Sequence, residues 1–362
     1  MENYYIFGAH PRAYTLYQYL KTLKPERNIL GFFYNNDEKN PEEIEGIRVI
    51  NLNENVGGLD CSAEVFIATR GVFHEKIIND LKELGFEKIT PVTPQMDTEL
   101  RNQYVKDYFG LWGKTFEKID SIKLDDNKTD LKSDTCVYIA KTVFDGDFSK
   151  PVDLKPFEKI IQAGAALAEK KLPDASYFDD VDENISKRNP QFCELTAFYW
   201  IWKHAKEDII GLEHWRRRFI LPENWIDVMQ SNRIDVILPV PLCVMPSLLE
   251  NYKFRHDSGV WEACMDILKK YHPDDYDDAI RFFEESNLYS PCNMIIAKRE
   301  VLLEYCEWLF PVLLELNDSI GKLEDKYQNR YPGFLSERLL NYFFEKNRER
   351  FNIVYADKSF LS

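Results

Sequence analysis

One stretch of the chain, residues 179–219, restricts the fold more than any other, because a helical pattern there passes directly into a short apolar strand. Over residues 192–203, large apolar side chains recur at spacings of three and four, which predicts an amphipathic helix. Residues 209–212 predict a strand, which is followed by Glu213, His214, Trp215 and three arginines. Ligands of α/β proteins bind beyond the carboxyl ends of strands, so we predict a site for a phosphorylated ligand here.

Two interpretations of this stretch stay open on composition alone. A run of three arginines is usually a solvated turn, and an aromatic helix is usually part of a core. The density of Asn, Glu, His and Arg side chains around a single strand end favours a binding site.

Length and composition limit the class of protein. A chain of 362 residues exceeds the usual size of one domain, so we expect two. Apolar residues make up 44% of the chain and aromatic residues 14%, which excludes a disordered protein. The net charge of −15 argues against nucleic acid as the main partner. An anionic ligand would therefore need a local basic patch.

The sequence also predicts a cytoplasmic location. The first residues, MENYYIFGAH, have neither a basic segment nor a long apolar run, so we expect no signal peptide. No stretch approaches eighteen uninterrupted apolar residues, so we expect no membrane-spanning helix. The seven cysteines are scattered singly, which is typical of reduced cytosolic thiols.

Residues 1–110 predict a Rossmann-like domain. Strands are expected at 4–7, 29–34 and 65–69, with a strand or edge segment at 48–51, and helices at 13–23 and 74–84. Strands that alternate with helices imply a parallel sheet. The first turn, GAHPRA from Gly8, lacks the second and third glycines of a dinucleotide site. Asp37 is a weak candidate for a ribose contact, and we expect this domain to contribute no chemistry.

Residues 111–134 turn polar and predict a linker, and 135–362 a second α/β domain. Its strands are expected near 137, 209, 235 and 293. Its helices are expected at 157–169, 276–285, 300–316 and 333–344. The first strand ends at Lys141, a cation that could meet a diphosphate.

A divalent metal such as manganese is left open. Asp275 and Asp277 form a DxD string, the spacing at which two carboxylates can share a metal with a diphosphate. The string leads into a predicted helix, so a solvated helix start is the favoured interpretation. Asp145 and Asp147 lie nearer a strand end and are a weaker alternative.

Four strings carry a resemblance to a known family. They are NISKRNPQFCELTAFYWIWK, IGLEHWRRRF, NMIIAKREVLLEYCEWLF and GFLSERLLNYF. They resemble bacterial glycosyltransferases of capsular and exopolysaccharide gene clusters, first catalogued as a domain of unknown function. The resemblance covers about residue 137 to the C-terminus. The N-terminal domain resembles small Rossmann-like modules found beside sugar-modifying enzymes.

The resemblance implies a GT-A-like glycosyltransferase domain in residues 135–362. Its expected reaction transfers a sugar from a nucleotide-sugar donor, with UDP the expected nucleotide, to a lipid-linked or oligosaccharide acceptor. Capsule, O-antigen or exopolysaccharide synthesis is the expected setting. The enzyme would work in the cytoplasm, with peripheral association at the inner face of the bacterial membrane. The sequence carries no indication of an oligomeric state.

Site residues follow from the resemblance and the strand ends together. Glu337 is the candidate base, expected on the outward face of its helix, although it could instead cap that helix or pair with an arginine. The candidate diphosphate contacts are Lys141, His214, Arg216 and Arg217. The candidates for reading sugar or ribose hydroxyls are Asn184, Ser186 and Asn189. Further residues expected in the donor or acceptor pocket are Glu194, His256, Asp257 and Arg338.

Two rival functions come from other classes. A nucleotide-dependent sugar oxidoreductase or epimerase would use the N-terminal domain, but it needs the complete glycine fingerprint that the first turn lacks. A non-catalytic scaffold of a polysaccharide assembly complex would have no need for His214 or Glu337.

Overall fold

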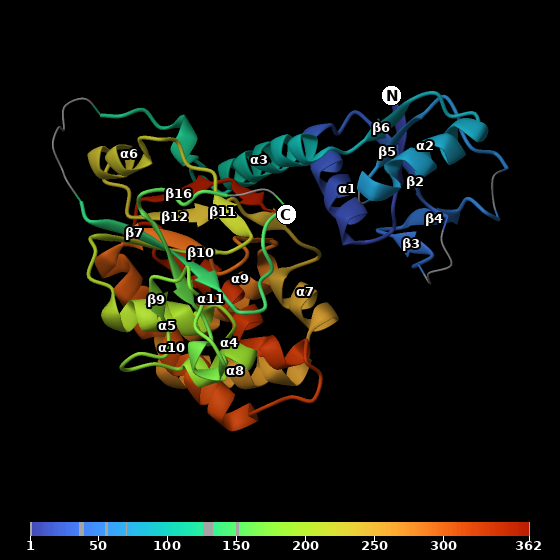
Figure 1. Cartoon of the computed structure of the whole chain (residues 1–362). Coiled ribbons are helices and arrows are strands. Elements are labelled where there is room, and N and C mark those ends of the chain that lie inside the picture. Colours follow the sequence, from blue (N-terminus) through green and yellow to red (C-terminus); the bar gives the residue numbers. More distant parts are fainter. Residues whose placement is uncertain are drawn as a thin grey trace. The chain divides into compact units, whose positions relative to one another are not determined.

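The computed structural model describes residues 2–35, 40–54, 57–69, 71–125, 133–149 and 152–361, which form two compact units (Figure 1). The first consists of Met1–Thr115 with Cys243–Met245, and the second of Phe116–Leu242 with Pro246–Ser362. Asp37 lies outside the described residues. Both units alternate strands and helices, and the predicted α/β class is confirmed.

A six-stranded sheet organises the first unit, in the order β3-β4-β2-β1-β5-β6. The strands are β1 (Asn3–Phe7), β2 (Asn28–Tyr34), β3 (Glu43–Ile44), β4 (Ile47–Asn51), β5 (Glu64–Ile67) and β6 (Ile89–Pro91). All neighbours pair in parallel except β3 with β4. The helices are α1 (Pro11–Leu23), α2 (His74–Glu83) and α3 (Pro94–Leu111).

Strand β1 shows why helices cover both faces of this sheet. Successive strand side chains point to opposite faces. Tyr4 and Ile6 pack with residues of α1, whereas Tyr5 and Phe7 pack with residues of α2. The apolar side chains on both faces of β1 are thus removed from water.

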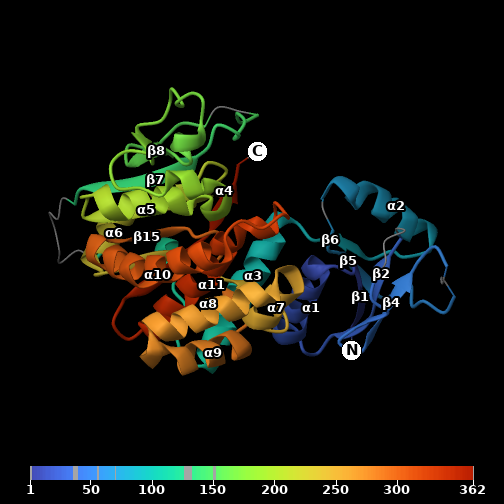
Figure 2. The same cartoon turned by 90° about the horizontal axis from the view of Figure 1, so that it is seen from below.

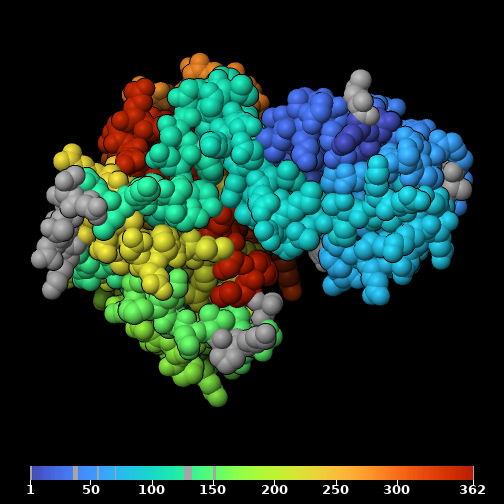
Figure 3. Space-filling model, turned by 90° about the horizontal axis from the view of Figure 1, so that it is seen from above, coloured from blue at the N-terminus to red at the C-terminus, as the bar shows by residue number. Residues whose placement is uncertain are grey.

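Part of the predicted linker belongs to the second unit. Ile119 is buried in that unit's core, and the backbone N–H of Tyr355 donates to the carbonyl of Glu117 at 2.9 Å. Lys118 forms an ion pair with Asp357 at 2.7 Å. Figure 3 draws this part of the chain in turquoise. Residues 116–121 are therefore structural, although their composition is polar.

The second unit contains a larger sheet in which the seven strands β16-β12-β15-β10-β7-β8-β9 lie side by side. Their bounds are β7 (Thr135–Lys141), β8 (Glu158–Gln162), β9 (Tyr177–Phe178), β10 (Ile209–His214), β12 (Val236–Pro239), β15 (Ile295–Lys298) and β16 (Ile353–Ala356). Of these, β15 alone runs antiparallel to its neighbours. A side ribbon of β11 (Arg217–Phe219) and β17 (Lys358–Phe360) joins at β10. Two short strands outside this sheet are β13 (Leu242–Cys243) and β14 (Leu288–Tyr289).

Helices cover both faces of this sheet (Figures 1 and 2). They are α4 (Asn189–Phe192), α5 (Leu195–His204), α6 (Trp225–Ser231), α7 (Leu248–Arg255), α8 (Ser258–Tyr271), α9 (Tyr276–Glu285), α10 (Arg299–Ile320) and α11 (Tyr331–Lys346). On one face α6 inserts Trp225, Val228 and Met229 among side chains of the strands. On the other, α10 lies against β10 and β15 and also contacts α5, α8 and α11. The second unit is therefore a three-layer α/β structure.

The prediction of a helix at residues 157–169 is wrong. Residues 158–162 form β8, which pairs in parallel with β7, and a 3-10 turn follows at Ala165–Leu167. Gly164 has a φ of +69°, a left-handed conformation that stops a helix. The helix predicted at 192–203 is divided into α4 and α5 by Cys193, whose φ is +50°.

The DxD string lies at a helix start, as favoured from the sequence. Helix α9 begins at Tyr276, between the two carboxylates. Asp275 accepts hydrogen bonds from Trp308 and Lys346, whereas Asp277 is exposed. The string therefore belongs to packing and to a solvated helix end.

A buried cluster of charges joins Glu158 of β8, Glu213 of β10 and Arg218 of β11. The Nη1 atom of Arg218 is 3.5 Å from Glu158 and 3.8 Å from Glu213. Glu213 also accepts the N–H of Phe219 at 2.6 Å, but its Oε2 has no hydrogen-bond partner. Because one arginine faces two carboxylates, burial dominates and raises the pKa of Glu213 to about 7.

We predict that Glu213 makes the second unit less stable as the pH rises. Because the pKa of Glu213 is raised in the folded state, folding takes up a proton between about pH 4.5 and 7. The stabilisation that comes from this proton uptake is fully present below pH 4.5 and is lost as the pH rises through about 7. The loss is worth roughly 3 kcal/mol, or about 5–10 °C in the thermal midpoint. Thermal unfolding at pH 5 to 8 should show a smaller drop for Glu213→Gln than for wild type. Glu304→Gln, which alters an exposed ion pair, should keep the wild-type slope. Parallel curves for Glu213→Gln and wild type would contradict the prediction.

Candidate functional site

A pocket of about 670 Å³ opens at the carboxyl ends of β7, β8 and β10 in the second unit. This is the position at which α/β sheets bind ligands. The side chains that line it come from the segments after these strands, from α4 and its C-terminal end, and from two later residues. They are Ala140, Thr142, Val143, Phe144, Asp145, Ala163, Gly164, Leu167, Ala168, Asn189, Pro190, Cys193, Glu194, His214, Trp215, Arg216, Arg217, Arg330 and Phe360.

The pocket is cationic although the chain has a net charge of −15. Three arginines line it, against the carboxylates of Asp145 and Glu194. Arg216 donates to the carbonyl of Gly146 at 3.1 Å, which fixes its guanidinium at the wall. A fixed guanidinium presents a planar fork of donors that matches phosphate or carboxylate oxygens. The pocket is therefore suited to an anionic ligand.

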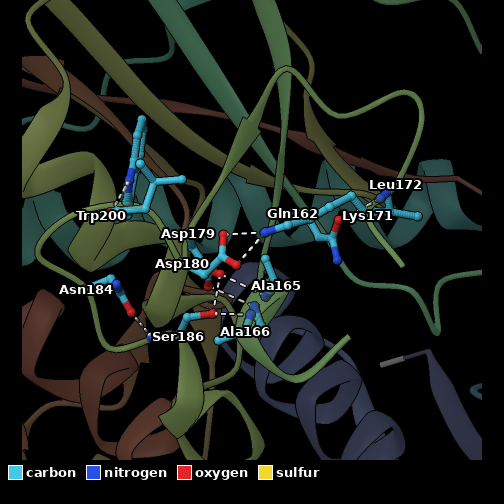
Figure 4. A network of polar contacts seen from close by, with 12 residues as sticks. Gln162, Ala165, Ala166, Lys171, Leu172, Asp179, Asp180, Asn184, Ser186 and Trp200 are labelled. Carbon is cyan, nitrogen blue, oxygen red and sulfur yellow. Dashed lines mark hydrogen bonds and ion pairs between the residues drawn. The ribbon is translucent and has the colours of Figure 1, made fainter. Parts of the chain in front are cut away.

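The wall after β8 is built around the buried carboxylate of Asp179 (Figure 4). This carboxylate accepts the N–H groups of Gly164 at 2.7 Å and Ala165 at 2.9 Å, and the hydroxyl of Ser186 at 2.5 Å. Ser186 in turn accepts the N–H of Ala166 at 3.0 Å. Hydrogen bonds to a charged acceptor are the stronger kind, so they hold this loop in one conformation.

Glycine is required at the centre of that loop. A Cβ atom on Gly164 would lie 2.7 Å from Cγ of Asn189, in addition to the left-handed φ. Asn189 lines the pocket and donates to the carbonyl of Cys193 at 2.8 Å. The close approach of Gly164 and Asn189 joins the β8 wall to the start of α4.

Of the three residues predicted to bind sugar or ribose hydroxyls, two have structural roles instead. Ser186 is fully buried and serves Asp179. Asn184 accepts the N–H of Ser186 at 3.1 Å and donates to the carbonyl of Asp182, so it stabilises a turn away from the pocket lining. Asn189 alone of the three reaches the pocket.

Lys141 is also absent from the pocket lining, contrary to the prediction. Its side chain is buried, pairs with Asp174 at 2.7 Å and lies 3.7 Å from the centroid of the Trp215 ring. A lysine held by a carboxylate and a ring face is already neutralised, so it is not available to a diphosphate.

Three further predicted pocket residues form a separate cluster around α11. Asp257 caps α8 by accepting the N–H of Gly259 at 2.8 Å. His256 stacks on Phe334, and burial together with Arg338 lowers the pKa of His256 to about 4. Arg338 is 3% exposed and donates to Asn251 and to the carbonyl of Phe334. Asp257, His256 and Arg338 all lie outside the pocket lining.

Glu337 is half-buried and does not line the pocket. Its Oε1 accepts the N–H of Cys292 at 2.8 Å, and its Oε2 lies 3.3 Å from Arg338. Burial raises the pKa of Glu337, and Arg338 opposes that shift. The outward orientation predicted for this carboxylate is therefore wrong, because the segment between β14 and β15 covers it.

His214 lines the pocket in a neutral form. Its Nε2 lies 2.5 Å from the carbonyl of Cys292, so Nε2 carries the proton, and Nδ1 faces Nη1 of Arg217 at 3.4 Å. Burial lowers the pKa of His214, and the positive charge of Arg217 adds to this shift although Glu194 opposes it. His214 therefore orients its neighbours and does not supply a positive charge.

Sequence reasoning missed Arg330. It ends a 3-10 turn at Gln328–Arg330 just before α11, and its Nε lies 3.1 Å from Sγ of Cys193. A basic residue directly before a proline-containing helix start was a signal that could have drawn attention to it. Within the described ranges, no group of three or more His, Cys, Asp or Glu side chains could hold a metal ion.

Comparisons with known proteins agree with this architecture. The chain shares its fold with a solved structure described as the apo form of WbbM, a bifunctional glycosyltransferase, at a TM-score of 0.54 and 24% sequence identity. The match covers 63% of this chain and 45% of the solved one, so the chain spans less than half of that protein. The chain and that solved structure therefore share an α/β fold over the matched region.

Residues 149–348 match the family model described as "Domain of unknown function (DUF4422)". The match covers more than half of the chain, which therefore belongs to this family. No curated protein matches the chain. None of the helices in the described residues combines the length and apolar character needed to cross a membrane.

We predict that Asp179→Asn weakens both the fold and the pocket. An asparagine offers one acceptor oxygen, and its NH₂ group would face a backbone N–H, so the change should cost roughly 2–4 kcal/mol. Asp180→Asn is the matched control, because Asp180 pairs near the surface with Lys171 and should contribute less than about 1 kcal/mol. Chemical unfolding of both variants measures the difference. Equal, small losses would show that the carboxylate of Asp179 does not hold the loop.

Proposed function

We propose that this protein is a glycosyltransferase that moves a sugar from a nucleotide-sugar donor to a glycan acceptor. The observation that carries the proposal is the arginine-lined pocket at the carboxyl ends of β7, β8 and β10 in a strongly acidic chain. The glycosyltransferase fold of the solved relative supports it. Capsule, O-antigen or exopolysaccharide synthesis is the setting that we propose, with UDP as the nucleotide of the donor.

The arginines would stabilise the leaving group. When the bond from the sugar to the diphosphate breaks, negative charge develops on the diphosphate, and fixed cations lower the energy of that state. Arg216 lies between β10 and β11, Arg217 begins β11, and Arg330 lines the pocket from the turn before α11. The neutral His214 keeps Arg217 in place through its Nδ1. Calorimetry of donor binding with and without manganese tests whether a metal contributes as well.

The rim of the pocket supports an acceptor with an apolar part. Four large apolar side chains that line the pocket are also exposed. Phe144 is 94% exposed, Phe360 69%, Leu167 54% and Val143 41%. Exposed apolar groups that gather around a polar site are typical of an interaction surface. A lipid-linked acceptor would cover them and bring the enzyme to the cytoplasmic face of the membrane.

We predict that Arg216→Ala combined with Arg217→Ala abolishes measurable donor binding. Each charge-assisted hydrogen bond that is lost should cost roughly 1.5–3 kcal/mol. Calorimetry with UDP-sugars, with and without manganese, measures the effect. Arg281→Ala is the matched control, since Arg281 is exposed on α9 and pairs with Asp278. Wild-type donor affinity in a folded double variant would contradict the diphosphate assignment.

We also predict that Phe144→Ser combined with Phe360→Ser lowers turnover with an alkyl-linked acceptor. Removing the burial of one large apolar side chain costs roughly 1.5–3 kcal/mol, so the loss should be at least about tenfold. Hydrolysis of the donor should not change in Phe144→Ser alone, which is the variant to use for this comparison, because the ring centroid of Phe360 lies 5.3 Å from the guanidinium of Arg217. Phe254→Ser, which removes an 86% exposed phenylalanine outside the pocket, is the control. Equal turnover of all variants would exclude the rim as an acceptor contact.

A further inference from the structure

Strained backbone gathers around one pocket residue, Glu194. Cys193 directly precedes it and has a φ of +50°, and Cys292 and Asn293 have φ values of +76° and +50°. Residues other than glycine rarely adopt this conformation, and those that do cluster at functional sites. Asn293 is 2% exposed and donates from Nδ2 to Oε1 of Glu194 at 2.8 Å. Both strained segments thus meet at the same carboxylate.

The strained segment at Cys292 and Asn293 is held from two sides. Glu337 accepts the N–H of Cys292 at 2.8 Å, and Nε2 of His214 donates to the carbonyl of Cys292 at 2.5 Å. Asn293 also donates to the carbonyl of Gly333 at 3.2 Å. These contacts over-determine the position of Asn293, and through Asn293 they fix the carboxylate of Glu194.

Two of the described residues that line the pocket are carboxylates, and they differ in their hydrogen-bond partners. Asp145 uses Oδ2 to accept the N–H of Thr142 at 2.8 Å and its hydroxyl at 2.9 Å, so it closes a turn. Glu194 receives its hydrogen bond on Oε1, and no described residue donates one to Oε2. Its side chain is 14% exposed, which leaves it accessible from the pocket.

We infer that Glu194 is the proton acceptor of the reaction, an inference that rests on the proposed glycosyl transfer. Oε2 would take the proton of the acceptor hydroxyl while the hydroxyl oxygen bonds to the anomeric carbon of the sugar. The bond from that carbon to the diphosphate breaks at the same time, and its electron pair leaves with the diphosphate toward the arginines. The proton then passes from Glu194 to water. A direct displacement of this kind inverts the anomeric configuration.

In this arrangement Glu337 and His214 are positioning residues. They touch the backbone of Cys292 and would act on the reaction through Asn293 and Glu194. Glutamine can still accept the N–H of Cys292, so Glu337→Gln should keep most of the activity and Glu337→Ala should not. This pattern separates a positioning role from proton acceptance, which glutamine cannot perform.

The test compares turnover and donor binding in the full-length protein, with UDP-glucose, UDP-galactose and UDP-N-acetylglucosamine as probes. Glu194→Gln should lower turnover on the order of 10²–10⁴-fold, while the donor dissociation constant changes less than about threefold. Formate should partly restore the turnover of Glu194→Ala by supplying a carboxylate. Glu183→Gln is the matched control, because Glu183 accepts from Tyr199 at 2.8 Å outside the pocket and should leave turnover unchanged.

The outcomes distinguish this inference from the proposed function. If wild-type protein neither binds nor turns over any of the three donors, the proposed function fails and the role of Glu194 fails with it. If wild type is active and a folded Glu194→Gln variant keeps its turnover, the role of Glu194 alone is overturned. Retention of the anomeric configuration in the wild-type product, measured by NMR, would likewise overturn it.

Discussion

The parallel pairing of β7 with β8 and β10 is the constraint on which the pocket depends. In this register Lys141 lies beside Gln162, and Ala140 lies beside His214, so the three strands end at one edge. The segments that follow β7, β8 and β10 each contribute residues to the lining of the pocket. The antiparallel strand β15 then brings the segment after β14 up against His214 from the other side. A binding site at this edge is therefore a consequence of the topology.

Buried carboxylates in the second unit act mainly as acceptors for backbone N–H groups. Asp179 holds the loop after β8, Glu213 accepts the N–H of Phe219, and Glu337 accepts the N–H of Cys292. The N–H groups held by Asp179 and Glu337 lie in loops, and that of Phe219 lies at the end of β11. Glu194 differs, because its partner is the side chain of Asn293 and its own side chain lines the pocket, whereas Asp179, Glu213 and Glu337 do not. Its partner and its place in the pocket separate Glu194 from the three structural acids.

The sequence predicted the α/β class, the strand at 209–212 and the position of Arg216 and Arg217 just beyond its end, because these depend on local pattern. Prediction from the sequence failed where a contact with a residue distant in the sequence decides the local structure or the role of a side chain. The small residues of 157–169 suit a helix, but pairing with β7 makes residues 158–162 a strand. Nothing in the local sequence shows that Lys141 pairs with Asp174 or that Ser186 serves Asp179. Both residues therefore matched the expected chemistry without being available for it.

Glu337, on helix α11, is a second case in which the local sequence does not show the contacts of a side chain. The leucines of α11 identify one buried face, and a helix packed on one side would leave Glu337 in solvent. Helix α11 is instead buried on most of its surface, including Ser336 and Arg338 on either side of Glu337. A half-buried carboxylate needs a donor, and the N–H of Cys292 supplies it. This hydrogen bond from Cys292 to the carboxylate of Glu337 helps to hold Cys292 in its strained conformation, and the adjacent Asn293 reaches Glu194. The family resemblance pointed to Glu337 and the helical periodicity gave its expected face, but only the tertiary contacts distinguish the acid that supports the pocket from the acid that faces it.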